Sequence, residues 1–170
     1  MILEVGDRDD EFRVLTDLAR LALAEGDGSK ALQFAEKAAD IAEELGNRDG
    51  LGAALVEQAL AFQRLGREQE APAVVERAQT LLEETQSGEF WRACWAKAQI
   101  LEALNPAAAL DALRQTMALL DQTRRQFQQD EARFAAVTHA RRLPAQQFHA
   151  LLLQQGQLAQ AQELAESWRL

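Results

Sequence analysis

The side chains best suited to nucleophilic or metal chemistry in this sequence are one cysteine, Cys94, and two histidines, His139 and His149. The histidines are ten residues apart, which is not the i,i+4 spacing that places two ligands on one face of a helix. Cys94 lies far from both along the chain. We therefore expect no metal site and no cofactor, and we interpret Cys94 as a small apolar residue of a helix.

Acidic residues occur in adjacent groups at Asp9–Glu11, Glu43–Glu44 and Glu83–Glu84. Neighbouring residues on a helix point about 100° apart, so these carboxylates do not converge as an acid–base pair. The glycines of Gly26-Asp27-Gly28 read as a turn, because no strand precedes them as in a phosphate-binding loop. The sequence thus predicts no catalytic residue and a protein that is not an enzyme.

Trp91 and Trp95 are the aromatic residues whose spacing is most informative. They are separated by i,i+4, so a helix would present both rings on the same face. Such a pair can anchor a binding partner, or it can pack as core beneath neighbouring helices. The sequence leaves both alternatives open.

The composition favours helices and excludes several classes of partner. Hydrophobic residues make up 48% of the 170 residues, and Ala, Leu, Gln and Glu dominate. The net charge of −9 disfavours nucleic acid, and residues 1–50 hold 13 acidic against 6 basic side chains. No apolar run approaches the roughly 20 residues that a membrane span needs. With a single cysteine and no secretory signal, we expect a cytoplasmic protein that does not contact membranes.

An internal repeat organises the chain. Gly26, with Ala31 and Ala38 after it, recurs 40 residues later as Gly66, Ala71 and Ala78. Apolar residues on either side recur at three- and four-residue steps, which predicts a helical hairpin around each turn. Weaker copies follow at Leu104-Asn105-Pro106 with Ala109, and at Gly156-Gln157-Leu158 with Ala161.

These signals predict helices throughout. The expected repeats cover residues 9–45 (helices 9–25 and 29–45), 51–85 (helices 51–65 and 68–85) and 89–127 (helices 89–104 and 106–127). An irregular helix follows at 128–143, where Pro144 should end or kink it. A final hairpin is expected at 145–168, with helices at 145–155 and 157–168.

This pattern resembles the tetratricopeptide repeat (TPR). The matching residues are Leu15, Leu18, Ala19, Gly26, Ala31 and Ala38 in the first repeat, and Leu55, Ala59, Phe62, Gly66, Ala71 and Ala78 in the second. The resemblance implies an all-α fold, a right-handed α-solenoid of about four TPR hairpins whose last one or two are degenerate. It also implies a single domain over residues 1–170.

The 40-residue period with the linker of residues 43–50 is similar to that of bacterial TPR arrays that precede CHAT protease domains. The helices around Phe134–Arg142 and Phe148–Gly156 are similar to those leading into such domains. The resemblance implies a sensor or adaptor part of a larger bacterial protein.

In TPR arrays the first helix of each hairpin lines a concave groove. By repeat register, that surface receives Arg13, Thr16, Asp17 and Arg20, then Val56, Glu57, Leu60 and Arg64, then Trp91, Cys94, Trp95 and Ala98. We predict that a protein or peptide binds in the groove through Arg13, Arg20, Glu57, Arg64, Trp91 and Trp95. The alternative function is a scaffold that self-associates into a homo-oligomer.

Overall fold

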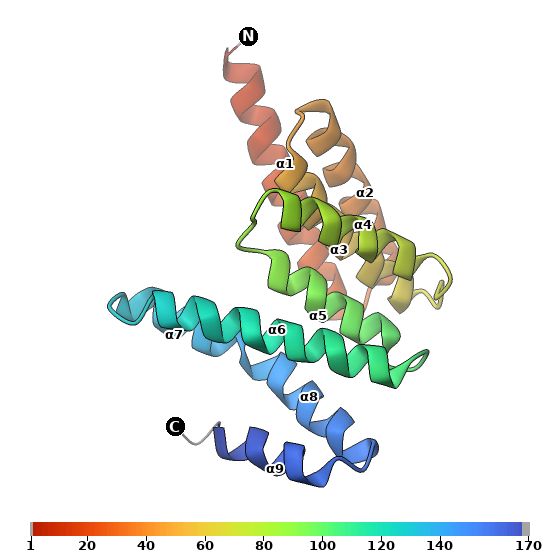
Figure 1. Cartoon of the computed structure of the whole chain (residues 1–170). Coiled ribbons are helices and arrows are strands. Elements are labelled where there is room, and N and C mark those ends of the chain that lie inside the picture. Colours follow the sequence, from red (N-terminus) through yellow and green to blue (C-terminus); the bar gives the residue numbers. More distant parts are fainter. Residues whose placement is uncertain (1, 168–170) are drawn as a thin grey trace. The chain divides into compact units, whose positions relative to one another are not determined.

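The computed structural model describes the backbone of residues 2–167 and the side chains of residues 8–167. Over this range the chain forms helices joined by short turns, with no strand, as the sequence predicted (Figure 1). None of the described helices is long and apolar enough to cross a membrane. The chain divides into two compact units, an N-terminal unit of Met1–Ile100 and a C-terminal unit of Leu101–Leu170. The boundary falls inside the third predicted repeat.

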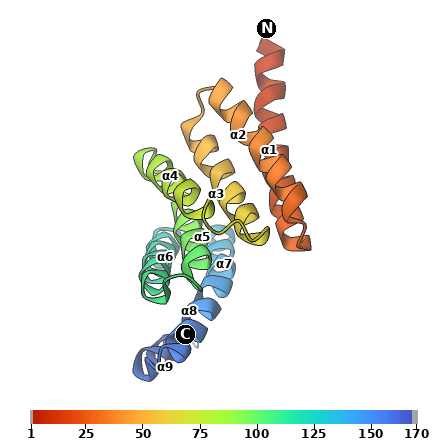
Figure 2. The same cartoon turned by 90° about the vertical axis from the view of Figure 1, so that its right-hand side faces the viewer.

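The N-terminal unit is built from successive helical hairpins. Its helices are α1 (Ile2–Glu25), α2 (Gly28–Glu44), α3 (Arg48–Arg64), α4 (Ala71–Glu84) and α5 (Phe90–Leu101). Helix α2 packs against both α1 and α3, α3 packs against α4, and α1 also contacts α3 (Figure 2). Helix α1 begins seven residues before the predicted start at residue 9.

The turns between these helices are formed by glycines of positive φ and by side chains that cap the next helix. Gly26 has a φ of +84° and Gly66 a φ of +70°, the left-handed region that glycine adopts without strain. The Asp27 carboxylate accepts a hydrogen bond from the backbone N–H of Lys30 at 3.0 Å and so caps α2. Asn47 caps α3 in the same way, accepting from Gly50 at 2.8 Å. The predicted turns at the two glycines are confirmed.

Small residues let the helices of the N-terminal unit approach closely. Ala38 and Ala78 are buried, as are Leu55 and Phe62, in agreement with the repeat register. Leu18, which also matches the repeat, is half-exposed. A Cβ on Gly52 would lie 2.7 Å from Cγ of the fully buried Leu82. Because only hydrogen occupies that space, α3 and α4 can pack in contact at this point.

The C-terminal unit departs from the regular repeat. It contains α6 (Pro106–Gln126), α7 (Glu131–Ala140), α8 (Arg142–Gln154) and α9 (Leu158–Ser167), with α6 packed on α7 and α8, α7 on α8, and α8 on α9. Asn105 caps α6 by accepting from the backbone N–H of Ala108 at 3.1 Å, and Pro106 opens the helix as predicted.

The irregular helix is shorter than the predicted 128–143. Helix α7 begins after its cap Asp130 and ends at Ala140, and α8 starts at Arg142. Pro144 lies in the first turn of α8, where its missing N–H costs no helical hydrogen bond, so the break comes ahead of the proline. The predicted end of the last hairpin at Trp168 lies outside the described residues.

Candidate partner-binding surface

Four charged side chains of the N-terminal unit form a closed ring of ion pairs across α1, α3 and α5. Arg20 Nε donates to Glu57 Oε1 at 2.9 Å, and an Arg92 terminal nitrogen donates to the same oxygen at 2.7 Å. Glu89 completes the ring, with its Oε2 3.2 Å from Arg20 and 3.3 Å from Arg92. Two positive and two negative charges thus alternate, and the ring is neutral.

Burial determines what the ring can do. The Glu57 side chain is only 1% exposed, whereas Arg20 and Arg92 are 31% and 25% exposed. Burial opposes the charge of Arg20, yet its pKa is raised, because the hydrogen bond to Glu57 and the negative charges of Glu57, Glu89 and Asp17 together outweigh burial. The buried carboxylate is therefore held between two guanidinium groups, and it ties three consecutive first helices of the repeats together.

The two tryptophans of α5 form one aromatic surface. Their ring centroids are 6.3 Å apart and the ring planes differ by 19°, so they stack. Both side chains are half-buried. By helical periodicity they lie opposite Ala93, Ala96 and Ile100, the α5 residues that pack into the core of the N-terminal unit. Within that unit, the pair is thus no part of the buried core.

Two further predicted residues lie outside the ring. Arg13 is exposed on α1 and pairs with Asp10 at 2.5 Å. Arg64 is at the end of α3, and its guanidinium lies 3.0 Å from the position that a Cβ of Gly26 would take. Arg64 therefore packs on the turn between α1 and α2, and the structure does not bring it to Arg20.

Several positions assigned to the surface by register are buried instead. Those residues are Thr16, Val56, Cys94 and Ala98. Thr16 satisfies its hydroxyl by donating to the backbone carbonyl of Phe12 at 3.0 Å. The register placed these residues on the correct helices, but the helix face that it assigned to the surface was too wide and included buried positions. Glu57 was assigned to the same surface and is also buried. The accessible set is therefore reduced to the arginines, Asp17, Leu60 and the two tryptophans.

Cys94 is unsuited to covalent chemistry. The amide of Gln79 lies 3.5 Å from its sulfur, and the thiol is fully buried. Burial raises the pKa of Cys94 to about 11, so the reactive thiolate is scarce at neutral pH. Over the described residues, no group of three or more His, Cys, Asp or Glu side chains could hold a metal ion.

The sequence reasoning missed Arg92 and Glu89, which close the ring. A signal for Arg92 was available, since it follows Glu57 by 35 residues, close to the repeat period, and lies between the two tryptophans. Glu89 precedes α5, and nothing in the repeat pattern singles it out.

Comparison with known proteins supports the fold. No protein-family model matches the sequence, and no curated protein matches it. Among solved structures, the chain is similar to a kinesin-light-chain-like protein of Podosopora anserina with nearly identical TPR-like repeats, at a TM-score of 0.54 and 19% identity over 92% of both chains. A single-substitution variant of that protein matches at a TM-score of 0.53, with the same identity and coverage. The chain therefore has the fold of TPR-like repeat proteins, an all-α solenoid of tandem helical hairpins.

Proposed function

We propose that the chain is a protein-binding module without catalytic activity, and that a segment of its partner lies along α1, α3 and α5. The stacked pair of Trp91 and Trp95 carries this proposal. The pair is half-buried and lies outside the core of its unit, and rigid aromatic side chains contribute strongly to protein interfaces.

The charged residues would act beside this aromatic anchor in different ways. Arg20 and Arg92 are part-exposed, so their outer nitrogens can reach a carboxylate or carbonyl of the partner. Glu57 is buried and would position the two arginines without touching the partner. Arg13 would lie at one margin of the surface and Arg64 at another, next to the Gly26 turn.

Affinity capture from the native host, followed by titration of the purified partner, tests the proposal. Trp91→Ala is expected to weaken binding about thirtyfold or more, equivalent to about 2 kcal/mol, because a desolvated aromatic anchor is lost. Arg20→Ala should weaken binding as well. The matched control is Arg77→Ala, since Arg77 also forms an ion pair between helices, with Glu43 at 2.8 Å, but belongs to α4.

The controls separate a lost contact from a lost fold. Trp91→Ala and Arg77→Ala should retain the helical far-ultraviolet spectrum and the melting midpoint. Arg20→Ala should retain the spectrum with a lowered midpoint, because it removes one of the two cations paired with the buried Glu57. If Trp91→Ala unfolds the chain, the tryptophans are core residues and the proposed surface is wrong. Normal binding by the folded Trp91→Ala and Arg20→Ala variants would place the partner on another face.

Self-association is the alternative function, favoured by exposed leucines of the C-terminal unit. Leu143 is 59% exposed, Leu153 46% and Leu158 66%. Apolar side chains at these positions can meet a second copy. Sedimentation equilibrium over a wide concentration range distinguishes the two functions, because a monomer at every concentration argues against a scaffold.

We propose a cytoplasmic location and a place in a larger bacterial protein on narrower grounds. The location rests on the single cysteine, since cysteine-poor chains without a possible internal disulfide suit a reducing compartment. The place in a larger protein rests on the similarity of the 40-residue repeat to arrays that precede CHAT domains. Fractionation of host cells with an antibody against the chain would test location and molecular size together.

A further inference from the structure

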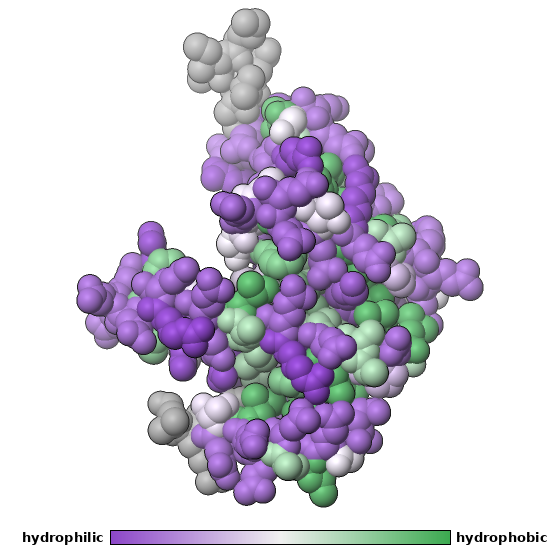
Figure 3. Space-filling view, viewed as in Figure 1, coloured by the Kyte–Doolittle hydropathy of each residue, from purple (hydrophilic) through white to green (hydrophobic). Residues whose placement is uncertain are grey.

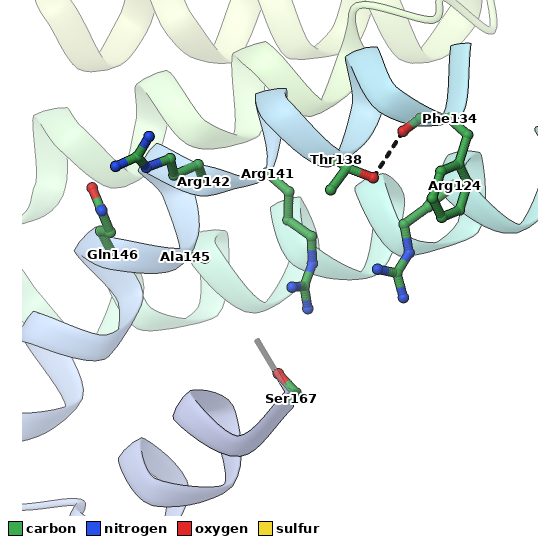
Figure 4. Close-up of a pocket in the computed structure, with 8 residues that line it drawn as sticks. All are labelled: Arg124, Phe134, Thr138, Arg141, Arg142, Ala145, Gln146 and Ser167. Carbon is green, nitrogen blue, oxygen red and sulfur yellow. Dashed lines mark hydrogen bonds between the residues drawn. The ribbon is translucent and has the colours of Figure 1, made fainter. Parts of the chain in front are cut away.

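A pocket of about 390 Å³ lies in the C-terminal unit, far along the chain from the tryptophans. Its lining includes Arg124 from α6, Phe134 and Thr138 from α7, Arg141 before α8, and Ser167 at the end of α9 (Figure 4). Guanidinium, hydroxyl and aromatic groups thus meet in a volume that suits a small ligand.

Arg124 lines the pocket and contacts an aromatic ring, but it forms no ion pair with a described side chain. Its guanidinium carbon lies 5.8 Å from the centroid of the Phe134 ring. Among the side chains of residues 8–167 it has no ion-pair partner, and the same is true of Arg142. Figure 4 shows Arg142 turned away, toward Gln146, so Arg124 is the more important of the two.

Arg141 is held in place by one acidic residue. Its side chain is only 12% exposed, and its Nε lies 2.8 Å from Asp121 Oδ1. These two atoms lack the alignment of a hydrogen bond, but a terminal nitrogen of Arg141 donates to Asp121 Oδ2 at 3.5 Å, so the carboxylate holds one edge of the guanidinium. In Figure 4 the guanidinium groups of Arg141 and Arg124 point to the same side, toward Ser167. Two guanidinium groups therefore converge with one carboxylate to balance them.

The surrounding sequence adds positive charge in a chain that is acidic as a whole. Residues 124–142 contain five arginines and two acidic residues. One of the five, Arg133, pairs with the Asp130 carboxylate at 3.3 Å, so its charge is neutralised within the chain. On the face drawn in Figure 3, the surface over this unit carries many hydrophilic residues with apolar ones among them. An anion would meet a favourable field at the pocket.

We propose that this pocket binds the phosphate or carboxylate group of a small organic anion. Arg124 and Arg141 would donate charge-assisted hydrogen bonds to its oxygens, since the guanidinium fork matches both groups. The Thr138 hydroxyl already donates to the Phe134 carbonyl at 2.8 Å, so the two arginines, and not Thr138, would supply the donors to the anion. The Phe134 ring forms an apolar wall for the organic part of the ligand.

Calorimetric titration of the full chain at low ionic strength tests the proposal, with inorganic phosphate, phenyl phosphate and benzoate as probes. All three should bind, and phenyl phosphate should bind more tightly than phosphate because of the aromatic wall. Phenol is the neutral control and should not bind. Arg124→Gln should weaken phenyl phosphate binding about tenfold or more.

Arg114→Gln is the matched control. Arg114 also belongs to α6, and its guanidinium also faces an aromatic ring, that of Phe148 at 6.0 Å. It pairs with Asp111 at 2.8 Å and does not line the pocket. This variant should bind the probes as the wild-type chain does.

Asp121→Asn gives a test of opposite sign. Removing the competing carboxylate releases Arg141, so phenyl phosphate should bind several times more tightly. If the arginines only hold α6 and α7 together, this variant would lose stability without gaining affinity, and the proposal is wrong. Equal weakening by Arg124→Gln and Arg114→Gln would also overturn it, because binding would then follow net charge alone. Absence of any heat with all three anions would do the same.

Discussion

The two units of the molecule use charge in opposite ways. Met1–Ile100 contains 20 acidic and 11 basic residues, and so carries the whole net charge of −9, whereas Leu101–Leu170 has seven of each. In the acidic unit most arginines pair with carboxylates of neighbouring helices, as in the ring around Glu57. In the neutral unit Arg124 and Arg142 have no such partner among the described side chains. The regular repeat thus pairs most of its arginines between helices, whereas the broken repeat leaves a larger share of its described arginines without an ion pair.

The two units also differ in how deeply their helices are buried. Helix α3 has ten buried residues, because α1, α2 and α4 all pack against it. Helix α7 has none among its described residues, and it packs mainly on α6 and α8. A helix inside a regular array has neighbours on most sides, whereas the helix that interrupts the period depends on a few half-buried contacts such as Phe134.

The largest effect is therefore expected in the local stability of these two helices. Amide hydrogens of α3 should exchange at least about a hundredfold more slowly than those of α7, since α7 can open without exposing a core. Hydrogen exchange followed by mass spectrometry measures the ratio. Equal protection of the two helices would show that α7 is covered in a way that its burial does not reveal.

A smaller effect is expected from truncating single leucines. Leu82 on α4 is 0% exposed, so Leu82→Ala should lower the free energy of unfolding by about 2–5 kcal/mol. The control is Leu153→Ala on α8, where the side chain is 46% exposed and the change should stay within about 0.5 kcal/mol. Urea unfolding followed by circular dichroism gives both values. Similar costs at the two positions would contradict the difference in packing between the units.

Most of the fold was predictable from the sequence because the repeated residues determine the local structure of each turn and helix. Gly26 and Gly66 marked the turns, and the three- and four-residue steps marked the faces that pack. Prediction lost accuracy between residues 128 and 143, where the period changes. There Pro144 indicated a break, but the helix ends were set by Asp130, which caps the start of α7, and by Arg141 at its end, neither of which the repeat period marks.

The site was predictable only in part. Periodicity placed Arg20 and Glu57 on facing helices, but it could not show that they bind each other, because the choice between a partner and a neighbour depends on distances of a few ångström. The register also could not show that the long side chain of Arg64 reaches back to the Gly26 turn. The arginine pocket was missed entirely, because Arg124 and Arg141 are far apart in any repeat register.

The smallest effect concerns a contact that the repeat reproduces. Arg8 pairs with Glu44, and Arg48 pairs with Glu84, so both partners recur after 40 residues. All four side chains are more than 40% exposed, and such surface pairs contribute little. Arg48→Ala should therefore shift the melting midpoint by no more than about 3 °C.

A double-mutant cycle on each pair shows whether residues at equivalent positions of the repeat also interact with equal strength. If the repeats are equivalent, the coupling between Arg8 and Glu44 should equal that between Arg48 and Glu84, and both should weaken at high salt because exposed charges are screened. Unequal couplings would mean that the pairs share a sequence position but not an environment. In that case the regularity of the N-terminal unit would lie in its buried alanines, such as Ala38 and Ala78, and its surface charges would be as irregular as those around the arginine pocket.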